Sequence, residues 1–111
     1  LLYRLVFNLV ENAIRYSRPD STVNVSICDT DSHVFLRVED QGPGIPKQYR
    51  ESIFQPFFRL DKSRSRAYGG AGLGLALVWE IAALHGGTVE VETSSENGTV
   101  MLVTLSKGAT T

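Results

Sequence analysis

Two asparagines and an arginine near the start of the chain have a spacing that suits a metal–phosphate site. Asn8, Asn12 and Arg15 lie at positions i, i+4 and i+7, which forms one polar stripe if the segment is helical. A side-chain amide oxygen is a hard ligand for Mg²⁺, an ion that typically keeps water and phosphate oxygens as its other ligands. An arginine one turn further on can neutralise phosphate charge. A solvated helix face gives the same pattern, so the stripe alone leaves both interpretations open.

A single carboxylate, Asp40, stands where an alternating segment runs into the loop "DQGPGIP", residues 40–46. A carboxylate can accept a hydrogen bond from an amino group on a base, and the neighbouring glycines let a flat ring approach the backbone. An aspartate that initiates a turn is the simpler alternative.

A glycine cluster at residues 69–74 precedes a helical pattern. It has the glycine spacing of a P-loop, but Leu75 and Ala76 occupy the positions of the required lysine and hydroxyl. Gly70 and Gly72 give the first pair of a dinucleotide fingerprint, but Leu75 occupies the third glycine position. Both designs are excluded. The remaining possibilities are an anion site at a helix N-terminus and a glycine-rich turn packed on a helix.

Four cations precede the glycines within eight residues: Arg59, Lys62, Arg64 and Arg66. On a chain with net charge −1, such a patch suits a polyphosphate. A solvated loop has the same composition, and the two interpretations are compatible.

Hydrophobic periodicity predicts the elements that position these groups. Leu2, Leu5, Val6, Leu9 and Ala13 share one side of the first helix. Strands over 22–28 and 33–39 form one hairpin, and Asn97-Gly98 joins a second hairpin. The class is α/β with a mixed or antiparallel sheet. Helices are predicted over 1–16 and 72–84, with a short one starting at Pro46, and the remaining strands over 88–93 and 99–105.

Length and composition fit one domain over residues 1–111. The near-zero net charge gives no argument for nucleic-acid or membrane binding. Cys28 is the only cysteine, which excludes an intramolecular disulfide and favours a reducing compartment. No apolar run approaches the roughly 20 residues of a membrane span. The chain opens without Met in the middle of a helical pattern, so we expect a fragment of a longer, N-terminally extended protein.

Taken together and in order, four motifs resemble the catalytic ATP-binding domain of bacterial two-component sensor histidine kinases, in the superfamily of DNA gyrase, heat-shock chaperones and mismatch-repair ATPases. "NLVENAIRYS" resembles the N box, "DQGPGIP" the G1 box, "FQPFFRLD" the F box and "GGAGLGLALV" the G2 box. The match covers nearly the whole chain.

The resemblance implies a two-layer α/β sandwich, with helices on one face of a mixed, mostly antiparallel sheet and an ATP lid over about residues 55–71. The first strand of complete family domains is expected to be missing here. Asn12 would ligate Mg²⁺, with Asn8 in support, and Arg59 would reach the γ-phosphate from the lid. Phe54, Phe57 and Phe58 would anchor the lid. The implied ATP-binding residues are Asn8, Asn12, Arg15, Tyr16, Asp40, Gly42, Gly44, Ile45, Phe57, Arg59, Gly70, Gly72, Leu73 and Gly74, of which Asn8 and Arg59 would be catalytic.

By the same resemblance, the γ-phosphoryl group of ATP would pass to a histidine on a separate dimerisation domain and then to a response regulator. The domain would be cytoplasmic, without nucleic-acid or direct membrane contact, and its parent anchored in the bacterial inner membrane. The alternatives are a non-catalytic nucleotide-binding module, an ATP hydrolase and a serine kinase of the same superfamily.

Two features favour phosphoryl transfer to another domain. The hydrolases of the superfamily carry a water-activating Glu four residues before the Mg²⁺ asparagine, but this chain has Asn8, which cannot act as a general base. Neither histidine resembles the family's phosphoacceptor, which an acid normally follows: Val34 follows His33 and Gly86 follows His85. We expect structural roles for both, at a strand entry and a helix end.

Overall fold

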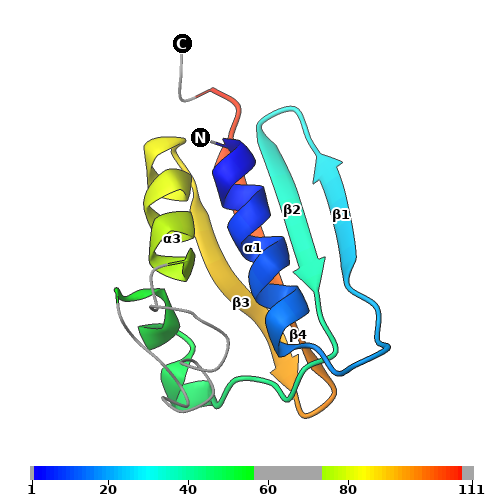
Figure 1. The fold of residues 1–111 in the computed structure, drawn as a ribbon. Helices are drawn as coiled ribbons and strands as arrows, with labels where there is room; N and C mark the ends of the chain where they lie inside the picture. The colour runs from blue at the N-terminus through cyan, green and yellow to red at the C-terminus, as the bar shows by residue number, and fades with distance from the viewer. Residues whose placement is uncertain (1, 57–73, 109–111) are drawn as a thin grey trace.

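A four-stranded sheet carries two α-helices on one face in the computed structural model, which describes residues 2–56 and 74–108 (Figure 1). This arrangement confirms the predicted α/β sandwich. The elements follow in the order α1 (Leu2–Tyr16), β1 (Asn24–Asp29), β2 (His33–Glu39), two 3₁₀ turns η1 (Lys47–Tyr49) and η2 (Ser52–Phe54), α3 (Gly74–Leu84), β3 (Thr88–Ser95) and β4 (Gly98–Ser106).

The strand order is β1-β2-β4-β3, and each neighbouring pair among these strands is antiparallel. The β1–β2 and β3–β4 hairpins are both as predicted. Gly98 has φ +145°, a conformation that favours glycine and explains the Asn-Gly signal at this turn. The sequence left a mixed sheet possible, but the described ladders are all antiparallel.

The first helix is nearly as predicted, but its buried stripe is narrower. Leu5, Leu9 and Ala13 are buried against the sheet and α3, whereas Leu2 and Val6 are 42% and 36% exposed. Leu2 stands at the start of α1, and Val6 lies at the margin of the buried stripe. The predicted apolar side of the helix is therefore buried only in part.

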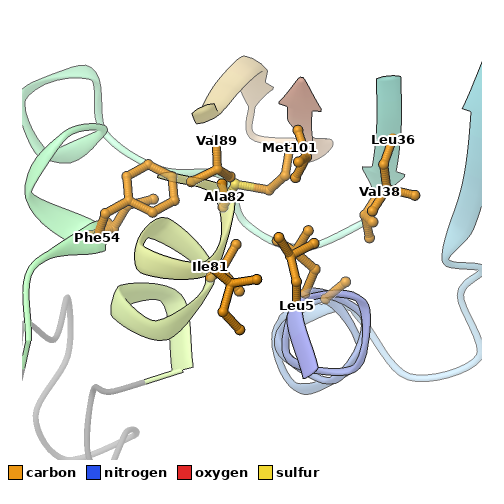
Figure 2. Packing of buried hydrophobic residues seen from close by; sticks show 13 residues of the cluster. Leu5, Leu36, Val38, Phe54, Ile81, Ala82, Val89 and Met101 are labelled. Carbon is orange, nitrogen blue, oxygen red and sulfur yellow. The ribbon is translucent and has the colours of Figure 1, made fainter. Parts of the chain in front are cut away.

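The core lies between the helices and the sheet, and Figure 2 shows its side chains converging there. Burying a Leu, Ile or Val side chain contributes about 1.5–3 kcal/mol to stability, so this cluster fixes α1 and α3 on the sheet. Its members are Leu5, Leu9, Ala13, Leu36, Val38, Ile53, Phe54, Val78, Ile81, Ala82, Val89, Met101 and Val103.

Strand β1 departs from its prediction as a half-buried strand, because all six of its residues are exposed. Val25 and Ile27 pair with the buried Val38 and Leu36, so their side chains project from the helix-side face of the sheet. They are nonetheless 47% and 71% exposed, because β1 is an outer strand and no described element covers it. The further N-terminal strand implied by the resemblance stays a prediction.

Two other predictions concern element bounds. The short helix predicted after Pro46 is split into the turns η1 and η2. Helix α3 begins at Gly74, and the predicted start at Gly72 lies outside the described residues.

Candidate functional site

Asn8 lies on α1 beside the N-terminal end of α3. Its Nδ2 atom donates a hydrogen bond to the carbonyl oxygen of Arg4, 2.8 Å away, which fixes the orientation of the amide. A Cβ atom added to Gly74 would lie 3.7 Å from the Oδ1 atom of Asn8. Two residues selected from separate motifs are therefore neighbours, and an amide oxygen lies beside the first described turn of α3.

Asn12 lies one turn further along α1 and is half-buried. Its side chain forms no hydrogen bond with another residue in the described ranges, which leaves the amide oxygen available to a ligand. Ala13, the next residue, is in the core, so the position of Asn12 is fixed by the packing of α1.

Arg15 and Tyr16 end the same helix. The Arg15 guanidinium lies 3.7 Å from the carboxylate of Glu11, and both side chains are partly exposed. An exposed pair of this kind contributes little to stability, so Arg15 can exchange Glu11 for a phosphate at small cost. Tyr16 is 38% exposed, which leaves its ring accessible at the end of α1.

Asp40 is buried directly after β2, with 8% of its surface exposed. Its Oδ1 atom accepts hydrogen bonds from the backbone N–H groups of Gly42, at 2.9 Å, and Thr99, at 3.2 Å. Burial raises the pKa of the Asp40 carboxyl above its ordinary value, opposed by these two hydrogen bonds and assisted by the nearby charge of Glu39. No described residue bonds Oδ2, so one carboxylate oxygen is structural and the other can face a ligand.

Glycines bring the loop after Asp40 into direct contact with its surroundings. A Cβ atom on Gly42 would lie 2.3 Å from the carbonyl oxygen of Tyr16, a distance that no side chain tolerates. Gly44 has φ +86°, and a Cβ there would lie 2.1 Å from the carbonyl oxygen of Ser95. These two positions hold the loop between the end of α1 and the β3–β4 hairpin.

Thr99 and Ser94 hold this loop in place through hydrogen bonds. The sequence did not lead us to expect a role for either residue. Thr99 is 3% exposed, its N–H holds Asp40, and its hydroxyl lies 2.8 Å from that of Ser94. Ser94 accepts the N–H of Ile45 at 2.7 Å, while Ile45 packs against the core. Strand periodicity could have identified Thr99, since it shares the buried row of β4 with Met101.

The two ends of the site lie along one helix. Gly42 contacts Tyr16 at the C-terminal end of α1, and Gly74 contacts Asn8 nearer its N-terminal end. Eight residues of α-helix separate Asn8 from Tyr16, a distance of about 12 Å at 1.5 Å per residue. The arrangement suits an elongated ligand with a base at the Asp40 end and an anionic group at the Asn8 end.

Several predicted site residues lie outside the described residues. Phe54 is within them, buried against Trp79 with ring centroids 5.4 Å apart. The predicted lid, apart from Gln55 and Pro56, is outside. The residues concerned are Phe57, Phe58, Arg59, Lys62, Arg64, Arg66, Gly70, Gly72 and Leu73.

A metal at this site would depend largely on ligands from outside the protein. Within the described ranges, no group of three or more His, Cys, Asp or Glu side chains could hold an ion. Asn12 offers one neutral oxygen one turn along α1 from Asn8, which lies beside Gly74. This donor set fits Mg²⁺, which binds protein through few ligands and takes the rest from water and phosphate.

A family model described as histidine kinase-, DNA gyrase B- and HSP90-like ATPase matches residues 1–109. The chain belongs to this family. The sensor protein RstB of Escherichia coli is 50% identical over 98 residues, which cover 88% of this chain and 22% of RstB. The sensor-like histidine kinase SenX3 of Mycolicibacterium smegmatis is 44% identical over 106 residues, 96% of this chain and 27% of SenX3. The chain thus spans about a quarter of these relatives' length.

Solved histidine kinases share the fold of this ATPase domain. The mycobacterial sensor histidine kinase MprB has a TM-score of 0.79 at 36% identity, over 93% of this chain and 68% of that one. Full-length ShkA in complex with AMPPNP has a TM-score of 0.79 at 28% identity, over 94% of this chain and 21% of that one. The relatives confirm the sequence resemblance: this is the ATP-binding catalytic part of a histidine kinase.

Proposed function

We propose that the domain binds Mg-ATP and donates the γ-phosphoryl group to a histidine on a separate domain of its parent protein. The observation that carries this proposal is the pairing of a buried carboxylate, Asp40, near the C-terminal end of α1 with Asn8 and Gly74 about two turns back along the helix. A base with an amino group and a chain of phosphates matches these two ends. The complex of ShkA with AMPPNP supports a nucleotide as the ligand.

At the base end, the free oxygen of Asp40 would accept a hydrogen bond from the adenine amino group. Its other oxygen is held by Gly42 and Thr99, so the carboxylate is oriented before the ligand arrives. Such preorganisation reduces the entropy lost on binding. Ile45 and Tyr16 would supply apolar surface beside the ring.

At the phosphate end, Asn12 would hold Mg²⁺, with Asn8 in support, and the start of α3 would face the phosphates. Mg²⁺ would supply neutralisation of phosphate charge. Arg15, released from Glu11, would add a cation. Arg59, Gly70, Gly72 and Leu73 are assigned to this end by resemblance alone.

The proposed chemistry is displacement at phosphorus. A neutral imidazole nitrogen of the acceptor forms a bond to the γ-phosphorus as the bond to the β–γ bridging oxygen breaks, and ADP leaves. Catalysis of this step is mainly positioning and charge stabilisation. Hydrolysis would need a base to activate water. Asn8 has no group that can act as a base, and Glu11, one residue before Asn12, lies about 100° around the helix from it.

The acceptor would come from outside the chain described here. His33 begins β2 with its ring bonded to the Ser32 hydroxyl at 2.8 Å, and His85 directly follows α3. These positions agree with the structural roles predicted for both. A histidine-bearing dimerisation domain and the receiver domain of a response regulator are the proposed partners.

The location of the parent protein stays a prediction. Among the described helices, none is both long and apolar enough to cross a membrane. A cytoplasmic position for this domain and an inner-membrane anchor elsewhere in the parent chain follow from the resemblance.

The test is the fate of the γ-phosphate. Labelled ATP is incubated with this domain, with and without the histidine-bearing segment of its parent. The proposal expects acid-labile label on that segment and little free phosphate without it. Steady phosphate release by the domain alone would favour a hydrolase, and nucleotide binding without transfer would favour a non-catalytic module. Acid-stable label on a serine would favour a serine kinase.

A further inference from the structure

A second concave surface lies between α3, the segment around η2 and β3. It encloses about 790 Å³ and includes no residue of α1 and neither Asp40 nor Gly74. It is therefore distinct from the two ends of the nucleotide site, although it shares Phe54, Gln55 and Pro56 with the predicted lid and its anchor. We call this surface the β3 groove, defined by residues 50, 51, 54–56, Ala76, Trp79, Glu80 and 88–91.

An aromatic pair forms the apolar part of the β3 groove. Trp79 on α3 is 50% exposed, while Phe54, 5.4 Å away between ring centroids, is buried. The neighbouring residue on α3, Ala76, is small and also lines the groove. A half-exposed tryptophan beside buried apolar side chains is typical of a contact residue at a protein interface.

The opposite wall is the outer edge of the sheet. Four consecutive residues of β3, numbers 88–91, line the groove, so the strand borders it along its backbone. Among the described strands, β3 pairs only with β4. An outer strand presents unpaired N–H and C=O groups, and an extended segment of another protein can pair with such an edge.

The charge of the β3 groove is negative. Glu51, Glu80 and Glu90 line it, and none of their carboxylates forms an ion pair with a described residue. The cation in the lining is Arg50, whose guanidinium already donates to the carbonyl oxygens of Ile45 and Ser94, at 3.4 and 3.1 Å. The groove therefore has three carboxylates without an ion pair to a described residue and one cation that already donates hydrogen bonds to backbone carbonyl groups.

The side chains of β3 point alternately to the two faces of the sheet, and this alternation determines which side chains a complementary segment needs. Val89 is buried and Val91 partly buried toward the helices, whereas Glu90 projects from the other face of the sheet. A strand added beside β3 would place alternate side chains against Trp79 and the remaining ones beside Glu90. Its first set would be apolar and its second set basic.

We propose that the β3 groove docks an extended segment of a partner protein in which apolar residues alternate with lysine or arginine. The segment pairs with β3 through its backbone, covers Trp79 with its apolar side chains and places its cations beside Glu90 on the other face of the sheet. This interaction is independent of the proposed phosphoryl transfer.

The probe is a nine-residue blocked peptide that alternates lysine and valine, titrated into the domain. Trp79 is the only tryptophan of the chain, so its fluorescence reports directly on the groove. The lysine peptide is expected to give a saturable change, and the same peptide with glutamate in place of lysine is expected to give none. Glu90→Gln should weaken binding about two- to fivefold. Asp31→Asn, which removes an exposed charge from the β1–β2 turn, is the matched control and should leave it unchanged.

Three outcomes would overturn the proposal. One is equal binding of the lysine and glutamate peptides, or none of either. Another is undiminished binding of a lysine peptide whose central valine and the following lysine are both replaced by proline, since one of these two N–H groups must face β3 in a paired strand. The third is a Trp79 signal that follows protein concentration alone, with a dimer in sedimentation, because the occupant would then be a second copy of the chain. ATP affinity, measured in parallel, should stay unchanged in every variant.

Discussion

The Oδ1 atom of Asn8 lies 3.7 Å from the position that a Cβ atom would take on Gly74. These residues are far apart in the sequence, and they meet because α1 and α3 pack side by side on one face of the sheet (Figure 1). Leu5 and Leu9 on α1 and Val78 and Ile81 on α3 share the core that fixes this contact. The phosphate end of the proposed site is thus a consequence of helix packing.

Asp40→Asn should separate nucleotide affinity from stability. An asparagine oxygen can still accept the N–H groups of Gly42 and Thr99, but its free end offers an amide in place of a charged acceptor. A hydrogen bond to a charged group contributes about 1.5–3 kcal/mol, so ATP affinity should fall roughly 10- to 150-fold by calorimetry. Asp31→Asn should bind ATP normally. Unchanged affinity in Asp40→Asn would refute the adenine role.

The same variant should reveal how much of the pH dependence of folding stability is caused by Asp40. Burial raises the folded-state pKa of this carboxyl above 3.8, so between 3.8 and the folded value the folded protein binds more protons than the unfolded chain. Stability from this group therefore falls as pH rises through that window. Denaturant unfolding should show Asp40→Asn gaining stability relative to the native protein from about pH 3.8 upward, then holding that gain.

Two other carboxylates affect the pH dependence of stability in the opposite direction to Asp40. The comparison with Asp40→Asn is needed to separate their effect from that of Asp40. Hydrogen bonding to Lys107 lowers the pKa of Asp29, and hydrogen bonding to Arg37 lowers that of Glu92. Their contributions are lost as pH falls and cancel in the difference between the two proteins. A difference that did not vary with pH would show that Asp40 has the same pKa in both states.

Gly42→Ala should destabilise the fold. The new methyl group would meet the carbonyl oxygen of Tyr16 at 2.3 Å, and backbone atoms on both sides of this contact must shift. Overpacking of this kind costs about 1–3 kcal/mol. Gly108→Ala is the matched control, since its Cβ would meet nothing within 4 Å, and its free energy of unfolding should change by less than about 0.5 kcal/mol. Equal stability of the two variants would contradict the close approach.

Asn12→Ala should remove the Mg²⁺ dependence of nucleotide binding, because the proposed metal ligand is lost. The comparison is ATP affinity with Mg²⁺ and with a chelator, in the native protein and in the variant. Glu11→Gln, at the adjacent position, should retain the dependence. If Asn12→Ala retains it as well, the metal is held elsewhere.

Local sequence patterns predicted the fold well wherever the structure of a segment depends on that segment alone. The Asn97-Gly98 turn, both hairpins and the core face of α1 at Leu5 and Leu9 follow from turn chemistry and periodicity. The exposure of β1 did not follow, because Val25 and Ile27 alternate as buried residues do. Their exposure depends on which elements lie above the strand, and this is a tertiary property.

The candidate site was predictable only in part for a similar reason. Asp40 and Gly42 stand in a distinctive motif, and their contacts with each other are local. Thr99 and Ser94 support the same loop from a distant hairpin, and no local pattern connects a threonine at position 99 with an aspartate at position 40. Their role becomes visible only when β2 and β4 pair.

The most direct test of the central claim is a comparison of adenosine and Mg-ATP by amide chemical shifts of the labelled domain. If the nucleotide lies along α1, adenosine should perturb amides at the base end of the site, among them Asp40, Gly42 and Thr99, and leave those of Asn8, Asn12 and Gly74 unchanged. Mg-ATP should perturb these and, in addition, Asn8, Asn12 and Gly74. Perturbation of the Asn8 end by adenosine alone, or no response at Asp40 to either ligand, would contradict the account.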